Sequence, residues 1–293
     1  MYILIGLFPS LMFGTMNLLV GKIGGNPRQQ NFGLALGAGT LSLLLVPFID
    51  NQWSVQAFLL GFFGAIFWSF GQIFMLQAFK YQGVSRSMPV IVGVQLVQNA
   101  LIGVLLLGEW QATLAFTLGI SALAMIITGI YATSYHEGAS PKSPEYNLRK
   151  GMFFAIISGV FYAIYPPMFQ YFKLNPNDAL GPMGIGILFS GVVFTLYLSK
   201  AYPQPLFTKK LGYLVGPGCM WALGNLTLLI SSSKLGVATG FTLSQLGVVI
   251  STLGGIFLLG EKRTKKEMVF VLVGVTLVVG GGILLGVAKS YDI

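Results

Sequence analysis

The sequence predicts an all-α integral membrane protein in which ten transmembrane helices form two inverted five-helix repeats. Three observations carry this prediction. Hydrophobic residues make up 55% of the 293 and charged residues only 9%, whereas soluble proteins average about 25% charged residues. Apolar runs long enough to cross the roughly 30 Å hydrocarbon core of a bilayer recur along the chain. A six-point sequence motif occurs twice, once in each half.

The apolar runs define the predicted helices. We place them at residues 2–20, 32–49, 55–78, 84–106, 111–133, 150–172, 179–199, 211–233, 237–259 and 267–288. The longest polar stretch falls in the middle of the chain. The predicted organisation is therefore a first repeat at 1–135, a linker at 136–149 and a second repeat at 150–293.

The duplicated motif reads Trp-x-x-Gly-amide, an apolar helix, a Gly-Val turn, a second apolar helix and a closing Leu-Leu-Gly-Glu. The first copy begins at Trp68 and ends at Glu109, and the second begins at Trp221 and ends at Glu261. The two spans differ in length by one residue. Such a match indicates an internal duplication, with the functional centre where the two copies face each other.

Because each repeat has five helices, an odd number, two similarly ordered repeats must have opposite orientations in the membrane. Inverted repeats of this kind are typical of secondary transporters, whose substrate sites lie near the membrane midplane. Only Lys173, Lys234 and Lys289 fall on the side of the termini, while the other fourteen Lys and Arg residues fall on the opposite side. The positive-inside rule therefore predicts extracellular termini and a cytoplasmic 136–149 linker.

Several function classes are disfavoured by composition. One Cys and one His in the whole chain leave no metal-ligand set and no nucleophile–base pair, so we expect neither a metal cofactor nor an enzyme. The net charge of +9 sits in short loops without a basic face, which indicates membrane anchoring rather than nucleic-acid binding. We expect the partners to be a small substrate and the lipid bilayer, with the chain a monomer or a homodimer.

Amides are the polar groups inside the predicted helices. Trp68 and Gln72 are spaced i,i+4, and so are Trp221 and Asn225 and also Gln95 and Asn99, so each pair shares one helix face. Buried amides need partners, so these should face the protein interior or a wet cavity. An aromatic ring beside amides suits a sugar, because the ring covers its C–H face and the amides bond its hydroxyls. The predicted substrate-binding residues are Trp68, Gln72, Gln95, Asn99, Trp221, Asn225, Gln245, Asn17 and Tyr165.

The competing interpretation of a lone amide is a helix-bridging contact, and we favour it for Gln77, Gln98 and Gln170. Pro9 and Pro166 fall at similar depths of corresponding helices, where each could mark a flexible bend or a static kink. Glu109 and Glu261 are predicted to accept N–H bonds from the start of the next helix; a role as gate or protonation site is the alternative.

The whole chain resembles the glucose/ribose porter family of the drug/metabolite transporter superfamily, close to the bacterial glucose uptake proteins. The likeness rests on the opening Pro9-Ser10 with Phe13-Gly14 and Asn17, and on the two Trp-x-x-Gly-amide stretches. The resemblance implies uptake of glucose or a related monosaccharide across the cytoplasmic membrane, with proton symport. No carboxylate lies inside a predicted helix to carry a proton, so coupling stays open.

The expected function is therefore uptake of a neutral monosaccharide by alternating access. The first alternative is an exporter of drugs, amino acids or other metabolites, as elsewhere in the superfamily. An exporter of cationic drugs would be expected to carry an embedded glutamate, and none is present. The second alternative is a membrane protein that transports nothing, which predicts a packed midplane without a cavity.

Overall fold

The computed structural model describes residues 2–108, 110–135, 137, 146–235, 241 and 243–291. All regular secondary structure in these residues is helical, and they contain no strand. Among them, eight helical segments are long and apolar enough to cross a membrane, and Leu243–Phe257 forms a shorter apolar helix. The prediction of an all-α, multi-pass membrane protein is confirmed.

The first half of the chain contains α1 (Tyr2–Ile23), α2 (Pro27–Leu45), a 3₁₀ turn η1 (Val46–Phe48), α3 (Val55–Gln82), α4 (Val84–Leu107) and α5 (Thr113–Thr133). Helix α2 begins earlier than the predicted residue 32. Asn26 accepts a hydrogen bond from the backbone N–H of Gln29 and the Gln29 side chain bonds back, a capping box that starts the helix at once. A single residue, Gly83, separates α3 from α4, as the Gly-Val turn predicted.

The second half contains α6 (Leu148–Tyr162), α7 (Tyr165–Tyr171), α8 (Pro176–Tyr197), α9 (Lys209–Leu235), α11 (Gly247–Phe257) and α12 (Lys265–Ser290). Helices α6 and α7 are two parts of the single helix predicted at 150–172. The helix breaks at Ala163 and Ile164, immediately before Pro166 and Pro167, because neither proline has an N–H to donate. Residues 236–240 and Thr242, at the start of the helix predicted at 237–259, lie outside the described part.

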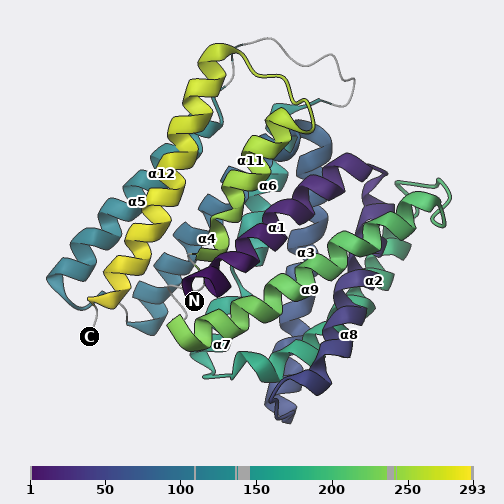
Figure 1. The fold of residues 1–293 in the computed structure, drawn as a ribbon, viewed down its shortest axis with the longest axis horizontal. Helices are drawn as coiled ribbons and strands as arrows, with labels where there is room; N and C mark the ends of the chain where they lie inside the picture. The colour runs from purple at the N-terminus through teal and green to yellow at the C-terminus, as the bar shows by residue number, and fades with distance from the viewer. Residues whose placement is uncertain are drawn as a thin grey trace.

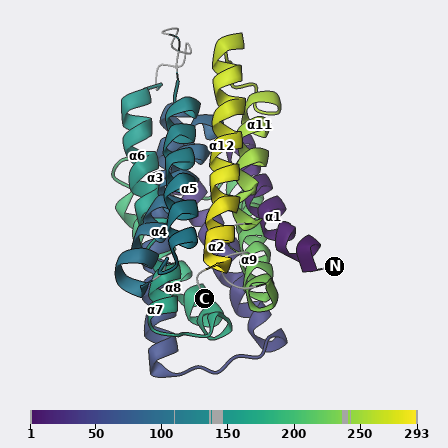
Figure 2. The same cartoon turned by 90° about the vertical axis from the view of Figure 1, so that its left-hand side faces the viewer.

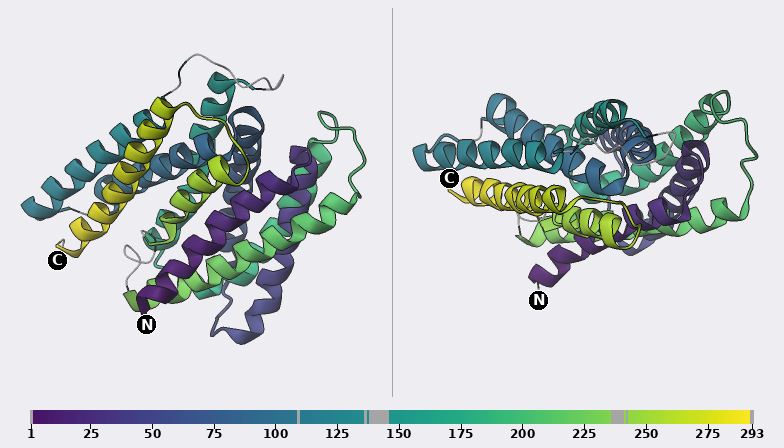
Figure 3. Two further views of the ribbon diagram at one scale, coloured as in Figure 1. Left: turned by 45° about the horizontal axis from the view of Figure 1, so that its top comes forward. Right: turned by 90° about the horizontal axis from the view of Figure 1, so that it is seen from above.

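The helices form one bundle in which segments from both halves alternate (Figure 1). Helices α5 and α12 run side by side at one edge, while α2, α8 and α9 pack together at the opposite edge (Figure 3). Helices α1, α3, α4, α6 and α11 lie between these two groups. Figure 2 shows both ends of the chain toward the same end of the bundle, which also holds the connection between α2 and α3.

Glycines set the closest approaches between helices. A Cβ atom on Gly37 of α2 would lie 2.0 Å from the carbonyl oxygen of Val215 in α9. One on Gly14 of α1 would lie 2.8 Å from the carbonyl oxygen of Gly247 in α11. No side chain fits at these contacts, and such small-residue contacts are how membrane helices gain packing energy without a hydrophobic driving force. The first brings α2 against α9, and the second brings α1 against α11 at the wall of the central cavity.

Candidate functional site

A cavity of about 100 Å³ lies at the centre of the bundle, lined by residues of α1, α3, α4, α6, α7, α9 and α11 and by Phe241, Ser244 and Gln245. Since one water molecule needs about 10–15 Å³ on this scale, the cavity has room for several. The structure brings seven of the nine predicted substrate-binding residues to its wall: Asn17, Trp68, Gln72, Gln95, Tyr165, Trp221 and Gln245.

The two tryptophans of the duplicated motif touch each other in this cavity. The ring centroids of Trp68 and Trp221 lie 4.4 Å apart with an interplanar angle of 45°. A sugar between them would need roughly twice the ~3.5–4.0 Å carbon contact distance, about 7 Å. The rings therefore do not bracket a ligand in this conformation. They form an aromatic pair in the cavity wall, against which a sugar ring could stack.

Gln72 lines the cavity and carries a buried donor that has no partner. Its side-chain oxygen accepts a hydrogen bond of 2.7 Å from the Tyr162 hydroxyl, while its side-chain nitrogen is buried and has no partner. Asn17 is similar: its nitrogen donates a long 3.4 Å bond to Ser251, and its buried oxygen has no partner. Unmade hydrogen bonds at buried groups cost about 1–3 kcal/mol each. A ligand hydroxyl, which both donates and accepts, would satisfy either group.

The glycine of each motif copy makes room for an aromatic ring from the other half of the chain. A Cβ atom on Gly71 would lie 2.7 Å from the Tyr162 ring, and one on Gly224 would lie 2.6 Å from the Phe13 ring. Both rings line the cavity. The motif glycine therefore positions a ring at the cavity wall, which explains its place between the tryptophan and the amide.

Two predicted residues do not line the cavity. Asn225 is 3% exposed and its side-chain nitrogen has no partner, but it does not reach the wall. Asn99 lies about one turn beyond Gln95, the last residue of α4 that lines the cavity, and its buried oxygen also has no partner. Helical spacing assigns a shared face, but it does not determine which members of that face reach a cavity.

The sequence-based list of site residues omitted Phe13, Tyr162 and Ser244, although all three line the cavity. Tyr162 stands three residues before Tyr165 and directly before the helix break, a combination that signals a side chain at a disrupted helix. Of the amides interpreted as helix bridges, Gln77 accepts a 3.1 Å bond from Tyr202 and Gln98 donates a 3.2 Å bond to the carbonyl of Val160.

The two prolines differ. Helix α1 continues without a break through Pro9, which is buried. Pro166 lies in the first turn of α7, directly after the break described above. Pro166 thus marks a discontinuity in the wall of the cavity, beside the lining residue Tyr165.

Glu109 lies outside the described residues, but Glu261 has a defined role. Its carboxylate accepts hydrogen bonds from the backbone N–H groups of Val84 (2.7 Å) and Ser85 (3.0 Å), at the start of α4. The prediction that it caps the next helix, α12, is wrong. Helix α12 has its own capping box, in which Thr264 and Glu267 exchange hydrogen bonds of 3.1 and 3.2 Å.

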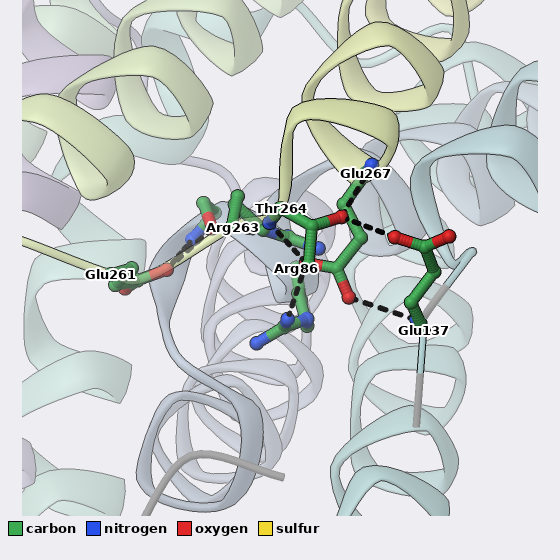
Figure 4. Close-up of polar contacts among 7 residues, drawn as sticks. Arg86, Glu137, Glu261, Arg263, Thr264 and Glu267 are labelled. Atoms are coloured by element: carbon green, nitrogen blue, oxygen red, sulfur yellow. Dashed lines mark hydrogen bonds and ion pairs between the residues drawn. The ribbon is translucent and has the colours of Figure 1, made fainter. Parts of the chain in front are cut away.

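A cluster of charged residues surrounds these helix starts (Figure 4). Arg86 of α4 and Glu267 of α12 form an ion pair of 3.5 Å, with both side chains almost fully buried. Arg263 donates a 3.2 Å hydrogen bond to Ser85. Burial, together with the nearby positive charge of Arg86, lowers the pKa of Arg263 to about 10. None of these residues lines the central cavity, so the cluster fastens α4, α12 and the loop between α11 and α12.

Comparison with known proteins now identifies the family. The family model described as "Sugar transport protein" matches residues 4–288. The chain belongs to this sugar transport family. It is 38% identical over 291 residues to the glucose uptake protein GlcU of Bacillus subtilis, covering 99% of each chain. It is 43% identical to a protein of Listeria monocytogenes provisionally named a sugar uptake protein, covering 99% of this chain and all of that one.

This is a family of transporters rather than enzymes. A solved crystal structure also shares the fold. It matches with a TM-score of 0.63 over 97% of both chains, at 17% sequence identity. At that identity the likeness concerns the fold alone.

Proposed function

We propose that this protein takes up a neutral monosaccharide, glucose first, by binding it in the central cavity. One observation carries the proposal: the described residues that line the cavity combine the Trp68–Trp221 aromatic pair with amides, and none of these residues carries a full charge. The unpaired nitrogen of Gln72 and the unpaired oxygen of Asn17 suit the hydroxyls of a sugar. The name of the Bacillus subtilis relative supports glucose as the sugar.

The packing of the helices supports an arrangement of ten membrane spans in two inverted repeats, with α6 and α7 together as one span. In chain order, α1 to α5 correspond to α6–α7, α8, α9, α11 and α12. When each helix is exchanged with its counterpart, α2–α9 packing becomes α8–α3, α1–α9 becomes α6–α3, and α4–α6 becomes α11–α1. All of these contacts are present, and α2–α8, α4–α11 and α5–α12 map onto themselves. The midplane cavity then lies between the repeats, as alternating access requires.

The charge distribution supports insertion in the cell membrane with the arginine- and lysine-rich end in the cytoplasm and both termini outside. The same end holds the Arg86–Glu267 cluster. Uptake would then proceed from the end that carries the termini toward the end that carries the cluster.

The lining of the cavity also bears on coupling. Proton symport usually needs a titratable group that both the proton and the substrate can influence, and the described lining has neither a carboxylate nor a histidine. We therefore expect the sugar gradient alone to drive uptake. Symport, which the family resemblance favours, is the alternative, and it would require a proton carrier outside this cavity.

Purified protein in liposomes tests the proposal. Labelled glucose should enter down its gradient, saturably, and unlabelled monosaccharides should compete. Absence of uptake of every monosaccharide offered would overturn the proposal. Competition by amino acids or cationic drugs, together with no effect of sugars, would support the exporter alternative. Repeating the assay with an imposed proton gradient separates symport from facilitated uptake.

A further inference from the structure

A second and larger cavity of about 640 Å³ lies at the cluster end of the bundle. We call it the vestibule. It is formed by the end of α1, the start of α2, the end of α3, the start of α4, the connection between α8 and α9, and the loop after α11. Its polar side chains include Asn26, Gln30, Tyr202 and Gln204.

The vestibule lies in line with the central cavity. Three helices line both cavities, and on each the two lining residues are four positions apart. Asn17, Met75 and Met88 line the central cavity, and Gly21, Phe79 and Val84 on the same helices line the vestibule. Four residues are about one helical turn, roughly 6 Å along the axis. The two cavities therefore stack end to end, with a barrier about one turn thick between them.

The barrier is a contact among three elements. A Cβ atom on Gly21 of α1 would lie 2.7 Å from the Leu259 side chain and 2.9 Å from the Val84 side chain. We call Gly21, Val84 and Leu259 the gate. Glu261 holds the gate closed, because its carboxylate binds the N–H groups of Val84 and Ser85 from two residues beyond Leu259.

Gly83 is required at this contact for two reasons. Its φ of +83° is a conformation that residues with a side chain rarely adopt. A Cβ atom there would also lie 2.7 Å from the Glu261 carboxylate. The glycine at the turn between α3 and α4 therefore leaves room for the Glu261 carboxylate, which binds the N–H groups that follow the turn.

The vestibule offers hydrogen-bonding groups of the kind found in the central cavity. Gln30 is 7% exposed; its nitrogen donates two long bonds of 3.4 Å to Val20 and Gly24 carbonyls, and its oxygen accepts none from the described residues. The Gln204 oxygen accepts a 3.1 Å bond from Asn26, which leaves the Gln204 nitrogen available. Lys80 and Glu261 contribute opposite charges to the lining, so together they give it no net preference for an ion of either sign.

We propose that the vestibule is a second binding site for the transported monosaccharide, separated from the central cavity by the gate that Glu261 holds closed. The inference rests on the proposed function, because it takes the same sugar as the ligand. A molecule released from the central cavity would pass the gate and bind Gln30 and Gln204 before leaving.

Equilibrium dialysis of purified protein against labelled glucose tests the second site. Wild type should bind two molecules per chain at saturation. Gln30→Leu and Gln72→Leu should each raise the Kd of one of the two sites and leave the other unchanged, and the double variant should raise both. One molecule bound by wild type and by Gln30→Leu alike would overturn the second site and leave the proposed function intact. No binding by wild type would instead overturn the proposed function. Gln204→Leu repeats the test if Gln30→Leu does not fold.

Thiol labelling tests the gate, since Cys219 is the single native cysteine. In a Cys219→Ala background, Met88→Cys places a thiol in the central cavity one turn beyond the gate. A membrane-impermeant maleimide added from the vestibule side should label it slowly. Adding Glu261→Ala should accelerate labelling at least tenfold. Glu137→Ala should not, because the Glu137 carboxylate accepts a 2.7 Å hydrogen bond from the Thr264 hydroxyl and does not contact the gate. Equal labelling rates with and without Glu261 would overturn its role in the gate.

Discussion

Replacing Gln72 with leucine tests whether the unpaired amide of the central cavity binds the sugar. The side-chain nitrogen has no partner in the empty protein, so a sugar hydroxyl that accepts from it gains a bond without breaking another. Leucine would leave that hydroxyl unpaired in a buried site, at a cost of about 1–3 kcal/mol. Since each 1.4 kcal/mol is about tenfold, the Kd for glucose should rise roughly 5- to 150-fold.

The same substitution removes the acceptor of the Tyr162 hydroxyl, so thermal stability should also fall. Tyr162→Phe combined with Gln72→Leu should restore stability without restoring affinity, which separates the two effects. Intrinsic tryptophan fluorescence measures binding, because Trp68 and Trp221 line the cavity. The matched control is Gln98→Leu, which loses a bond to the Val160 carbonyl outside the cavity. Equal affinity in Gln72→Leu and Gln98→Leu would refute the reasoning.

Three further predictions follow from the geometry. Gly71→Ala should reduce uptake at least tenfold because its Cβ would displace the Tyr162 ring, while Gly216→Ala, with open space at its Cβ, should leave uptake unchanged. Arg86→Ala should destabilise the fold by about 3–5 kcal/mol by leaving Glu267 buried without its ion-pair partner. Arg86→Met with Glu267→Gln, which removes both charges and keeps an oxygen to cap α12, should cost far less in a thermal melt. Uptake rates in proteoliposomes should be the same with and without an inward proton gradient; accumulation of glucose above the external concentration would refute uncoupled transport.

The membrane spans were largely predictable from the sequence because the length of an apolar run fixes whether it can cross the bilayer. The Gly83 turn was predictable for a related reason, since the runs predicted at 55–78 and 84–106 leave too few residues between them for a long loop. Capping side chains and prolines moved the helix boundaries away from those that hydropathy predicts. The capping box at Asn26 and Gln29 extended α2, and Pro166 and Pro167 divided the helix that the hydropathy pattern presents as continuous.

The duplicated motif was enough to predict which residues belong near the site. It could not predict which of them the packing of the helices brings to the cavity wall. The repeated tryptophans do meet in one cavity, together with Gln72. Asn225 has the same i,i+4 relation to its tryptophan as Gln72, yet it does not reach the cavity wall. The partner of Glu261 was not predictable either: it caps α4, which lies 177 residues away in sequence from the carboxylate.

An experimentally determined structure with glucose bound tests the central claim most directly. The account predicts density for one sugar in the central cavity, with its ring against the Trp68–Trp221 surface and a hydroxyl within hydrogen-bond distance of the Gln72 side-chain nitrogen. Glucose bound elsewhere, with that cavity empty and Gln72 still unpaired, would contradict it.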